Sequence, residues 1–288
     1  MPVAASESVK TSPPTPTGSS PRLNHLRLLE AESIHILREV ASEFERPVML
    51  YSIGKDSTTM IHLARKAFFG RLPFPLVHID TTYKYPEMIS YRDKMVKEWD
   101  ANLIVGRNEE AIACNMGPGQ GRLLCCEKLK TDGLSRIVEQ CDFHGLFLGI
   151  RRDEEGSRAK ERVFSPRDKN FEWAYKDQPP ELWDQFNTTF EKGTHIRVHP
   201  ILHWTELNIW EYIKRENIEI CPLYYAKEGK RFRSLGCMPC TKPIDSVAGT
   251  IDEIIEELKI IKAPERAGRA QDQENAYAMQ KLRAKGYM

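Results

Sequence analysis

The chain has 288 residues, enough for one large domain or for a domain with a substantial appendage. Its 42 basic and 41 acidic side chains nearly cancel, so charge gives no reason to expect non-specific binding to nucleic acid or to a membrane. No apolar run approaches the roughly 20 residues of a membrane span. Residues 1–21 are rich in Pro, Ser and Thr and lack the apolar core of a secretion signal, so they are predicted to be a disordered tail.

The first half of the chain alternates between helical and strand-like patterns. Residues 22–45 carry apolar side chains at helical spacing and predict a covering helix. After them, short runs that are apolar on both faces alternate with amphipathic stretches, which predicts an α/β fold with a parallel sheet covered by helices on both faces. The expected strands are 47–52, 75–80, 101–106 and 145–150, and the expected helices are 57–69, 85–99 and 133–143.

The second half is less regular. Residues 194–217 predict a strand followed by a helix, with Thr205 as its N-cap. Residues 226–244 are rich in Arg, Lys, Gly and Pro and predict a loop. Residues 250–260 form an amphipathic helix pattern, and the charged residues 263–288 are interpreted as a helix or a solvated tail.

The stretch "SIGKDS", residues 52–57, follows the first predicted strand and opens a helix. Backbone N–H groups at a helix N-terminus favour an anion, and Gly54 lets the backbone approach it closely. Lys55 supplies a point charge, and Ser52 and Ser57 supply hydroxyl donors. The alternative interpretation is an ordinary strand-to-helix turn with Ser and Asp as caps. The spacing excludes a Walker A loop, which needs Gly, four residues, then Gly-Lys-Ser/Thr.

The same stretch resembles the PP-loop signature of the ATP pyrophosphatase superfamily, Ser-Gly-Gly-Lys-Asp-Ser, with Ile53 at a glycine position. The resemblance implies ATP with Mg²⁺ as cofactor, a grip on the β- and γ-phosphates, and attack of a nucleophile on the α-phosphate. Asp80, after the second strand, matches a family position near the nucleotide; its alternative interpretation is a turn cap. The residues implied to bind the nucleotide are Ser52, Gly54, Lys55, Asp56, Ser57 and Asp80, with Lys55 also catalytic.

Longer stretches resemble the small subunit of the bacterial heterodimeric sulfate adenylyltransferase, from about residue 22 to the end. They include "PVMLYSIGKDS", "RRDEEGSRAKERVFSPRD" and "IRVHPILHWTELNIWEYI". The resemblance implies transfer of an adenylyl group from ATP to sulfate, giving adenosine 5'-phosphosulfate and pyrophosphate. It also implies a large GTPase subunit as partner. We expect residues 22–200 to form the PP-loop nucleotide-binding domain and residues 201–288 to complete the substrate site.

A charged cluster, residues 151–162, follows the predicted strand 145–150. Arginine binds dianionic oxyanions with two parallel hydrogen bonds, so Arg151 and Arg152 are predicted to be catalytic and to hold sulfate or the α-phosphate. Asp153 and Glu154 would orient them or a Mg²⁺. The alternative is a solvated, self-paired helix face. Sulfate is already ionised at neutral pH, so the site needs no general base. Further candidates for the nucleotide pocket are Arg231 and Arg233.

Four of the seven cysteines form a CC…CxxC pattern: Cys125, Cys126, Cys237 and Cys240. Four thiolates are the usual ligand set of a [4Fe–4S] cluster or a structural Zn²⁺, and the related adenylylsulfate reductases hold a cluster with such an arrangement. The small adenylyltransferase subunits generally lack the cysteine pair. The alternative is an ordinary buried pair with a chance CxxC. An odd number of cysteines without a secretion signal predicts the reducing cytoplasm.

Two other functions stay open beside adenylyl transfer to sulfate. The cysteine pattern favours an Fe–S-dependent reductase of adenylylated sulfate, but no cysteine follows Cys240 to supply the attacking thiolate. A PP-loop thiolation enzyme acting on tRNA is disfavoured by the near-neutral charge and the lack of an evident RNA-binding domain.

Overall fold

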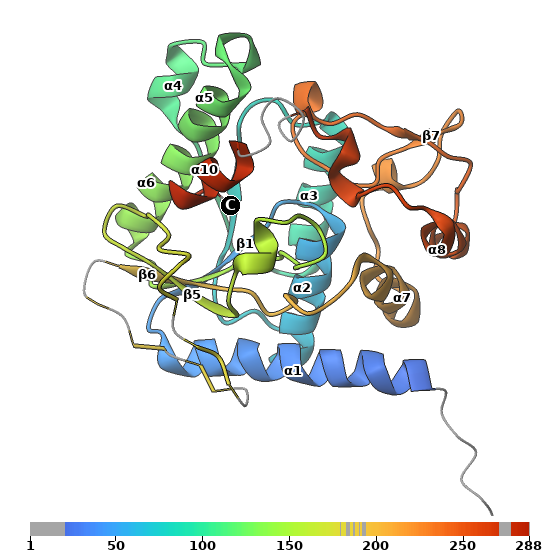
Figure 1. The fold of residues 1–288 in the computed structure, drawn as a ribbon, viewed down its shortest axis with the longest axis horizontal. Helices are drawn as coiled ribbons and strands as arrows, with labels where there is room; N and C mark the ends of the chain where they lie inside the picture. Colours follow the sequence, from blue (N-terminus) through green and yellow to red (C-terminus); the bar gives the residue numbers. More distant parts are fainter. Residues whose placement is uncertain are drawn as a thin grey trace, which may run out of the picture.

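The structure is a computed structural model that describes residues 21–178, 180–182, 185–186, 188–189, 191, 194–270 and 278–287. Nearly all of the predicted N-terminal tail lies outside these residues. Helix α1, Pro21–Glu43, runs along one side of the molecule as the helical spacing predicts (Figure 1). Its apolar stripe, which includes Leu29 and Leu37, is buried in the main core.

A six-stranded sheet in the order β3-β2-β1-β4-β6-β5 forms the centre of the fold. The pairs β3-β2, β2-β1, β1-β4 and β4-β6 are parallel, which confirms the predicted α/β class. The edge strand β5 is antiparallel to β6 and was not predicted, because "FSPR" lacks an apolar pattern; its Pro166 is tolerated at an edge. The strands are β1 Pro47–Leu50, β2 Leu76–Ile79, β3 Leu103–Gly106, β4 Gly145–Phe147, β5 Phe164–Arg167 and β6 His195–Val198.

The helices follow the predicted order, with shorter additions. Thr205 caps α7 as predicted, since its hydroxyl accepts a hydrogen bond of 3.2 Å from the Asn208 N–H. A π-helical turn, Glu127–Thr131, joins α5 to α6, and a small second sheet pairs β7, Lys230–Arg231, with β8, Ile244–Asp245. The remaining helices are α2 Lys55–Ala67, α3 Pro86–Glu98, α4 Glu109–Ala113, α5 Arg122–Cys126, α6 Asp132–Cys141, α7 Glu206–Glu216, α8 Ile251–Ile260 and α10 Ala278–Ala284.

The C-terminal end packs into the molecule and forms α10 over Ala278–Ala284, which confirms the helix among the two interpretations of residues 263–288. Arg283, on α10, is 1% exposed. The Arg197 guanidinium on β6 donates hydrogen bonds to the carbonyl oxygens of Gly286 and Tyr287, at 2.5 and 2.8 Å. In Figure 1, α10 lies between α6 and the centre of the sheet. The charged end is therefore held in place because its backbone carbonyl oxygens accept the hydrogen bonds of the buried Arg197 guanidinium.

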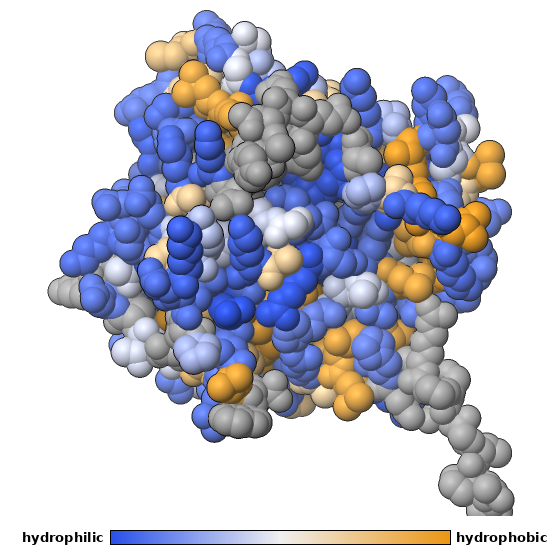
Figure 2. All heavy atoms as spheres, viewed as in Figure 1, coloured by the Kyte–Doolittle hydropathy of each residue, from blue (hydrophilic) through white to orange (hydrophobic). Residues whose placement is uncertain are grey.

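The face drawn in Figure 2 is mostly hydrophilic, with smaller apolar areas between the charged side chains. Among the described helices, none is both long and apolar enough to cross a bilayer.

Candidate functional site

A cavity of about 140 Å³ lies at the carboxyl ends of β1, β2 and β4. Ligands of parallel α/β sheets bind at this edge, because the loops that follow neighbouring strands converge there. The loop at residues 52–57, called the phosphate loop below after the role that its resemblance implies, contributes Ser52, Gly54, Asp56 and Ser57 to the lining. The C-terminal region adds further lining residues, namely Tyr224, Ser234, Leu235, Gly236, Glu265, Arg266, Arg269 and Tyr287.

The phosphate loop has a closed internal geometry. The hydroxyl oxygens of Ser52 and Ser57 are 3.0 Å apart, and the Lys55 N–H at the start of α2 donates to the Tyr224 hydroxyl at 2.8 Å. Ile53 has a φ of +70°, which costs an L-residue with a branched side chain roughly 1–2 kcal/mol. Its side chain is fully buried, and burying an isoleucine contributes about 1.5–3 kcal/mol. The burial thus offsets the strain of an isoleucine at the position where the superfamily signature has glycine.

Gly149, two residues after the end of β4, lies against the first turn of α2. A Cβ at this position would lie 3.0 Å from the Ser57 backbone nitrogen and 3.2 Å from the Asp56 carbonyl carbon. Because these neighbours are backbone atoms, Gly149→Ala is expected to push the phosphate loop away and to destabilise the fold by about 1–3 kcal/mol. Nucleotide affinity measured by calorimetry should fall with it. Gly156→Ala, where no atom lies within 4 Å of the added Cβ, is the control; equal affinities for both variants would contradict the close approach.

Lys55 lies at the centre of a buried ionic network. Its ammonium group pairs with Glu265, with Asp56 at 3.2 Å, and with the Arg233 carbonyl oxygen at 3.4 Å. Burial raises the pKa of the Glu265 carboxyl, but Arg151 and Lys55 outweigh burial and lower it. The carboxylate of Glu265 is thus an anion of the protein itself, bound to the lysine of the phosphate loop at a helix N-terminus that favours anions.

Arg151 belongs to the same network. Its guanidinium is fully buried and pairs with Asp56, with Glu265 and with Asp153, the last at 2.9 Å. Asp153 therefore orients Arg151 as expected. Arg151 is paired with three carboxylates, however. In this structure it links Asp56 of the phosphate loop to Glu265 of the C-terminal segment and has no unpaired charge for an oxyanion.

Arg152 lies outside the lining of the cavity, although it was predicted to be catalytic. Its side chain points to the Glu161 carbonyl oxygen at 3.4 Å, and its backbone N–H bonds to the Leu202 carbonyl. Arg151 lies outside the lining as well, because Asp56, Asp153 and Glu265 hold its guanidinium. The rest of the charged cluster is partly self-paired, through Arg158 with Glu154.

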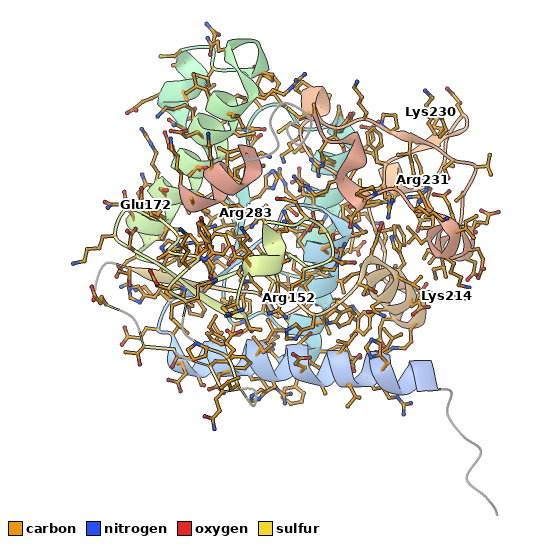
Figure 3. The ribbon with its side chains drawn as sticks, in the orientation of Figure 1. Arg152, Glu172, Lys214, Lys230, Arg231 and Arg283 are labelled. Carbon is orange, nitrogen blue, oxygen red and sulfur yellow. The ribbon has the colours of Figure 1, made fainter. Side chains whose placement is uncertain are left out.

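Arg231 and Arg233 are also bound elsewhere. Arg231 pairs with Glu257 at 2.6 Å beside β7. In Figure 3 it lies with Lys230 at the edge of the molecule, away from Arg152 and Arg283. Arg233 makes a two-pronged contact with Glu206, at 2.7 and 3.0 Å. Neither side chain lines the cavity in this structure, so their contact with the nucleotide stays a prediction.

Asp80 forms a turn cap, the alternative interpretation of this residue. Its carboxylate accepts the Thr82 N–H at 2.8 Å and pairs with Arg107 at 2.5 Å. Burial raises the pKa of Asp80, and these two partners together lower it below its usual value. The neighbouring residues Val77, His78 and Ile79 line the cavity instead.

The four predicted metal ligands come from distant parts of the sequence, and all four are buried. Burial, and then the thiols of Cys126, Cys237 and Cys240, raise the pKa of Cys125 to about 12. Burial also raises the pKa of Cys237, but Lys130 and Lys84 outweigh burial and lower it to about 7. All seven cysteines are described, and all are free thiols.

The arrangement of these thiols does not show a metal site. Across the described ranges, no group of three or more His, Cys, Asp or Glu side chains is placed to hold a metal ion. The cluster or zinc site thus stays a prediction. If the prediction holds, protein purified without oxygen contains iron or zinc in stoichiometric amount, and Cys237→Ser loses that metal. The control is Cys114→Ser, which changes an exposed cysteine outside the predicted ligand set. A colourless preparation free of both metals would contradict the prediction.

Several residues of the pocket gave no recognisable sequence signal. Glu265 and Arg269 come from the charged end of the chain, where mixed charge is typical of a solvated surface. Lys84 and Lys130 are isolated lysines in helical or loop patterns. Only long-range packing brings these residues to the same edge of the sheet.

Comparisons with known proteins agree with a nucleotide pocket at the carboxyl ends of the strands. The phosphoadenosine phosphosulfate reductase domain family matches residues 46–243. A relative from Colwellia psychrerythraea strain 34H, named sulfate adenylyltransferase subunit 2, is 47% identical over 296 residues that cover 92% of this chain and 99% of the relative. The chain belongs to the sulfate adenylyltransferase subunit 2 family. The predicted family and enzyme class, a nucleotidyltransferase, are thereby confirmed.

Solved structures show the fold of this subunit 2 family member independently. A Candida glabrata FMN adenylyltransferase in complex with FAD and inorganic pyrophosphate has a TM-score of 0.59 at 15% identity, covering 88% of this chain and 91% of that one. A phosphoadenylyl-sulfate reductase from Candida auris has a TM-score of 0.54 at 16% identity, covering 78% and 98%. At such identities the similarity concerns the architecture, which positions a pocket at the carboxyl ends of the strands.

Proposed function

We propose that the chain transfers the adenylyl group of ATP to sulfate, with the phosphate loop holding the leaving pyrophosphate. The observation that carries the proposal is the loop at residues 52–57. This loop leads from the carboxyl end of β1 into α2 and lines the cavity, and its buried Lys55 pairs with the carboxylate of Glu265. Membership of the family supports sulfate as the acceptor.

The proposed reaction is an in-line displacement. A sulfate oxygen attacks the α-phosphorus of ATP, the bond from that phosphorus to the bridging oxygen breaks, and pyrophosphate leaves with the electron pair. The products are adenosine 5'-phosphosulfate and pyrophosphate. The protein brings two anions together and neutralises charge on the leaving group, so cationic side chains and backbone N–H groups carry the catalysis. In this proposal Lys55 neutralises the leaving pyrophosphate after a phosphate displaces the Glu265 carboxylate that Lys55 now contacts.

Mg²⁺ fits the donor set of the pocket, since this ion binds proteins through one or two carboxylates together with substrate phosphates. Asp56 and Glu265 line the cavity and are the residues that would hold it, in exchange for their present pairs with Lys55 and Arg151. When bound, the ion supplies further charge neutralisation on the phosphates.

The family name implies a second subunit, and we extend the proposal to a GTPase partner whose GTP hydrolysis drives this uphill step. The proposal also includes a cytoplasmic setting, where ATP and GTP are available. Residues 22–200 would form the nucleotide-binding domain. Residues 201–288 would complete the site, supported by the lining that Tyr224 and Glu265 contribute.

The test is pyrophosphate release from MgATP with and without sulfate, using protein purified without oxygen, alone and with the cognate large subunit and GTP. Mass spectrometry identifies the nucleotide product. Sulfate-dependent formation of adenosine 5'-phosphosulfate that GTP and the partner stimulate is the expected result. Turnover without sulfate dependence would refute the proposal and return attention to the reductase or thiolation alternatives.

A further inference from the structure

The cavity has an excess of basic side chains, and its acidic groups are already paired. The acidic side chains in the lining are Asp56, Glu154 and Glu265. Arg151 bonds to both Asp56 and Glu265. Arg158 pairs with Glu154, and Arg266 lies 3.3 Å from the same carboxylate. These pairs leave no lining carboxylate to neutralise the other basic groups of the cavity.

Lys84, Lys130 and Arg269 are those other groups. Lys130 donates to the Tyr287 hydroxyl at 3.2 Å and lies 5.4 Å from the centre of its ring. The Arg269 guanidinium donates to hydroxyl and carbonyl oxygens only, namely Ser234 Oγ at 3.0 Å, Thr241 Oγ1 at 3.0 Å and Leu235 O at 2.5 Å. Neutral acceptors orient a cation without cancelling its charge.

The three cations line the same cavity of about 140 Å³, so their charges repel one another there. Burial is the main cause that lowers the pKa of Lys84 to about 8, and the charges of Lys130 and Arg269 lower it further. Cys237, the thiol whose own pKa these cations lower, and Asp80, which is itself paired with Arg107, offset this shift only in part. Crowding three cations against a cavity is unfavourable unless an anion joins them.

The backbone is shaped to admit one of these cations. A Cβ on Gly236 would lie 1.9 Å from Arg269 Nη1 and 2.8 Å from Thr241 Oγ1. Only glycine leaves room for the guanidinium beside the cavity at this point. Gly236→Ala therefore displaces the Arg269 guanidinium without removing its charge. This variant tests whether the position of the guanidinium matters, and Arg269→Gln tests whether its charge matters.

We propose that Lys84, Lys130 and Arg269 form the subsite for the acceptor oxyanion, a tetrahedral dianion of the sulfate type, in the same cavity as the phosphate loop. The inference rests on the proposed function, since it places the second substrate of that reaction. A dianion loses much of its hydration in such a cavity, and several charge-assisted hydrogen bonds compensate for that loss. The subsite replaces Arg151 and Arg152, whose guanidinium groups are engaged elsewhere.

The test compares Lys130→Gln, Arg269→Gln and Gly236→Ala with Lys128→Gln. Lys128 is a matched control from the same π-helical turn, because its side chain is 42% exposed and pairs with Asp132 at 2.9 Å. Calorimetry on the full chain measures the Kd of the ATP analogue AMPCPP, and equilibrium dialysis with labelled sulfate measures sulfate binding in its presence. The KM for sulfate is measured with the partner subunit and GTP. Thermal unfolding checks that each variant is folded.

The expected result is a sulfate affinity about ten- to hundredfold weaker in the three site variants, because each loses or misplaces a charged donor. Their affinity for AMPCPP and all properties of Lys128→Gln should stay unchanged. Unchanged sulfate affinity in folded site variants would overturn the subsite. An equal loss of affinity for AMPCPP would also overturn the subsite, since the cations would then hold a phosphate of the nucleotide.

The two proposals fail in different ways. If wild-type protein binds sulfate, the variants lose that binding, and no adenylyl transfer follows, the subsite stands and the proposed function falls. If wild-type protein forms adenosine 5'-phosphosulfate and the variants keep its KM for sulfate, the function stands and the subsite falls. Wild-type protein that neither binds sulfate nor turns it over would overturn both.

Discussion

Lys55→Ala is expected to lower kcat/KM for ATP by at least about 10²-fold, the usual effect of removing one donor from a site that stabilises developing charge. The ammonium group is fully buried beside the cavity, and no other lysine of the phosphate loop can replace it. Pyrophosphate release measured over a range of ATP concentrations checks the prediction. Lys55→Arg should recover only part of the activity, because a planar guanidinium cannot take the place of a compact ammonium.

The fold should survive this substitution. Glu265 keeps its pairing with Arg151, so Lys55→Ala does not leave the buried carboxylate without a cation. Lys97→Ala, an exposed lysine on α3, serves as the control for the loss of a positive charge alone. If Lys55→Ala turned over ATP at the rate of this control, the phosphate-loop assignment would be refuted.

Arg151→Ala is expected to reduce the free energy of unfolding by about 3–5 kcal/mol, because it removes the cation shared by buried carboxylates. Asp56 and Glu265 would then both depend on Lys55. From the sequence, Arg151 was predicted to hold sulfate or the α-phosphate. The structure instead predicts joint weakening of ATP and sulfate binding, since Arg151 ties the phosphate loop to the C-terminal segment. Urea denaturation and the two binding measurements check this.

The neighbouring Arg152 provides the control for this prediction. It makes one long hydrogen bond to a backbone oxygen, so Arg152→Ala should change stability by no more than about 1 kcal/mol. Equal destabilisation by the two substitutions would mean that the network around Arg151 contributes little. A selective loss of sulfate use in Arg151→Ala, with ATP binding intact, would restore the original assignment of Arg151 to the oxyanion.

Glu265 links these two predictions. In the present conformation its carboxylate contacts both Lys55 and Arg151, the cations nearest to the phosphate loop. A nucleotide phosphate would compete with it for Lys55. The α/β core and the C-terminal segment therefore meet at the same charges that the proposed reaction uses, which explains why stability and ATP binding are expected to change together.

The sequence by itself determined the core of the fold and the phosphate loop. Apolar runs such as 47–50 and 76–79 become parallel strands because burial on both faces leaves a pattern that is local in sequence. The loop at residues 52–57 could likewise be located, since a strand, a glycine and a helix start occur within a few residues. The edge strand β5 could not, because its pairing with β6 is a long-range contact without a periodic signal.

Only the tertiary structure decided which charges belong to the pocket. Arg151, Arg152, Arg231 and Arg233 looked alike in the sequence, but one is buried in a carboxylate network and three point elsewhere. Lys84, Lys130 and Arg269, which carried no local signal, line the cavity instead. The physical reason is that a side chain's charge acts through space over a few ångströms, and the partners within that distance come from distant parts of the chain.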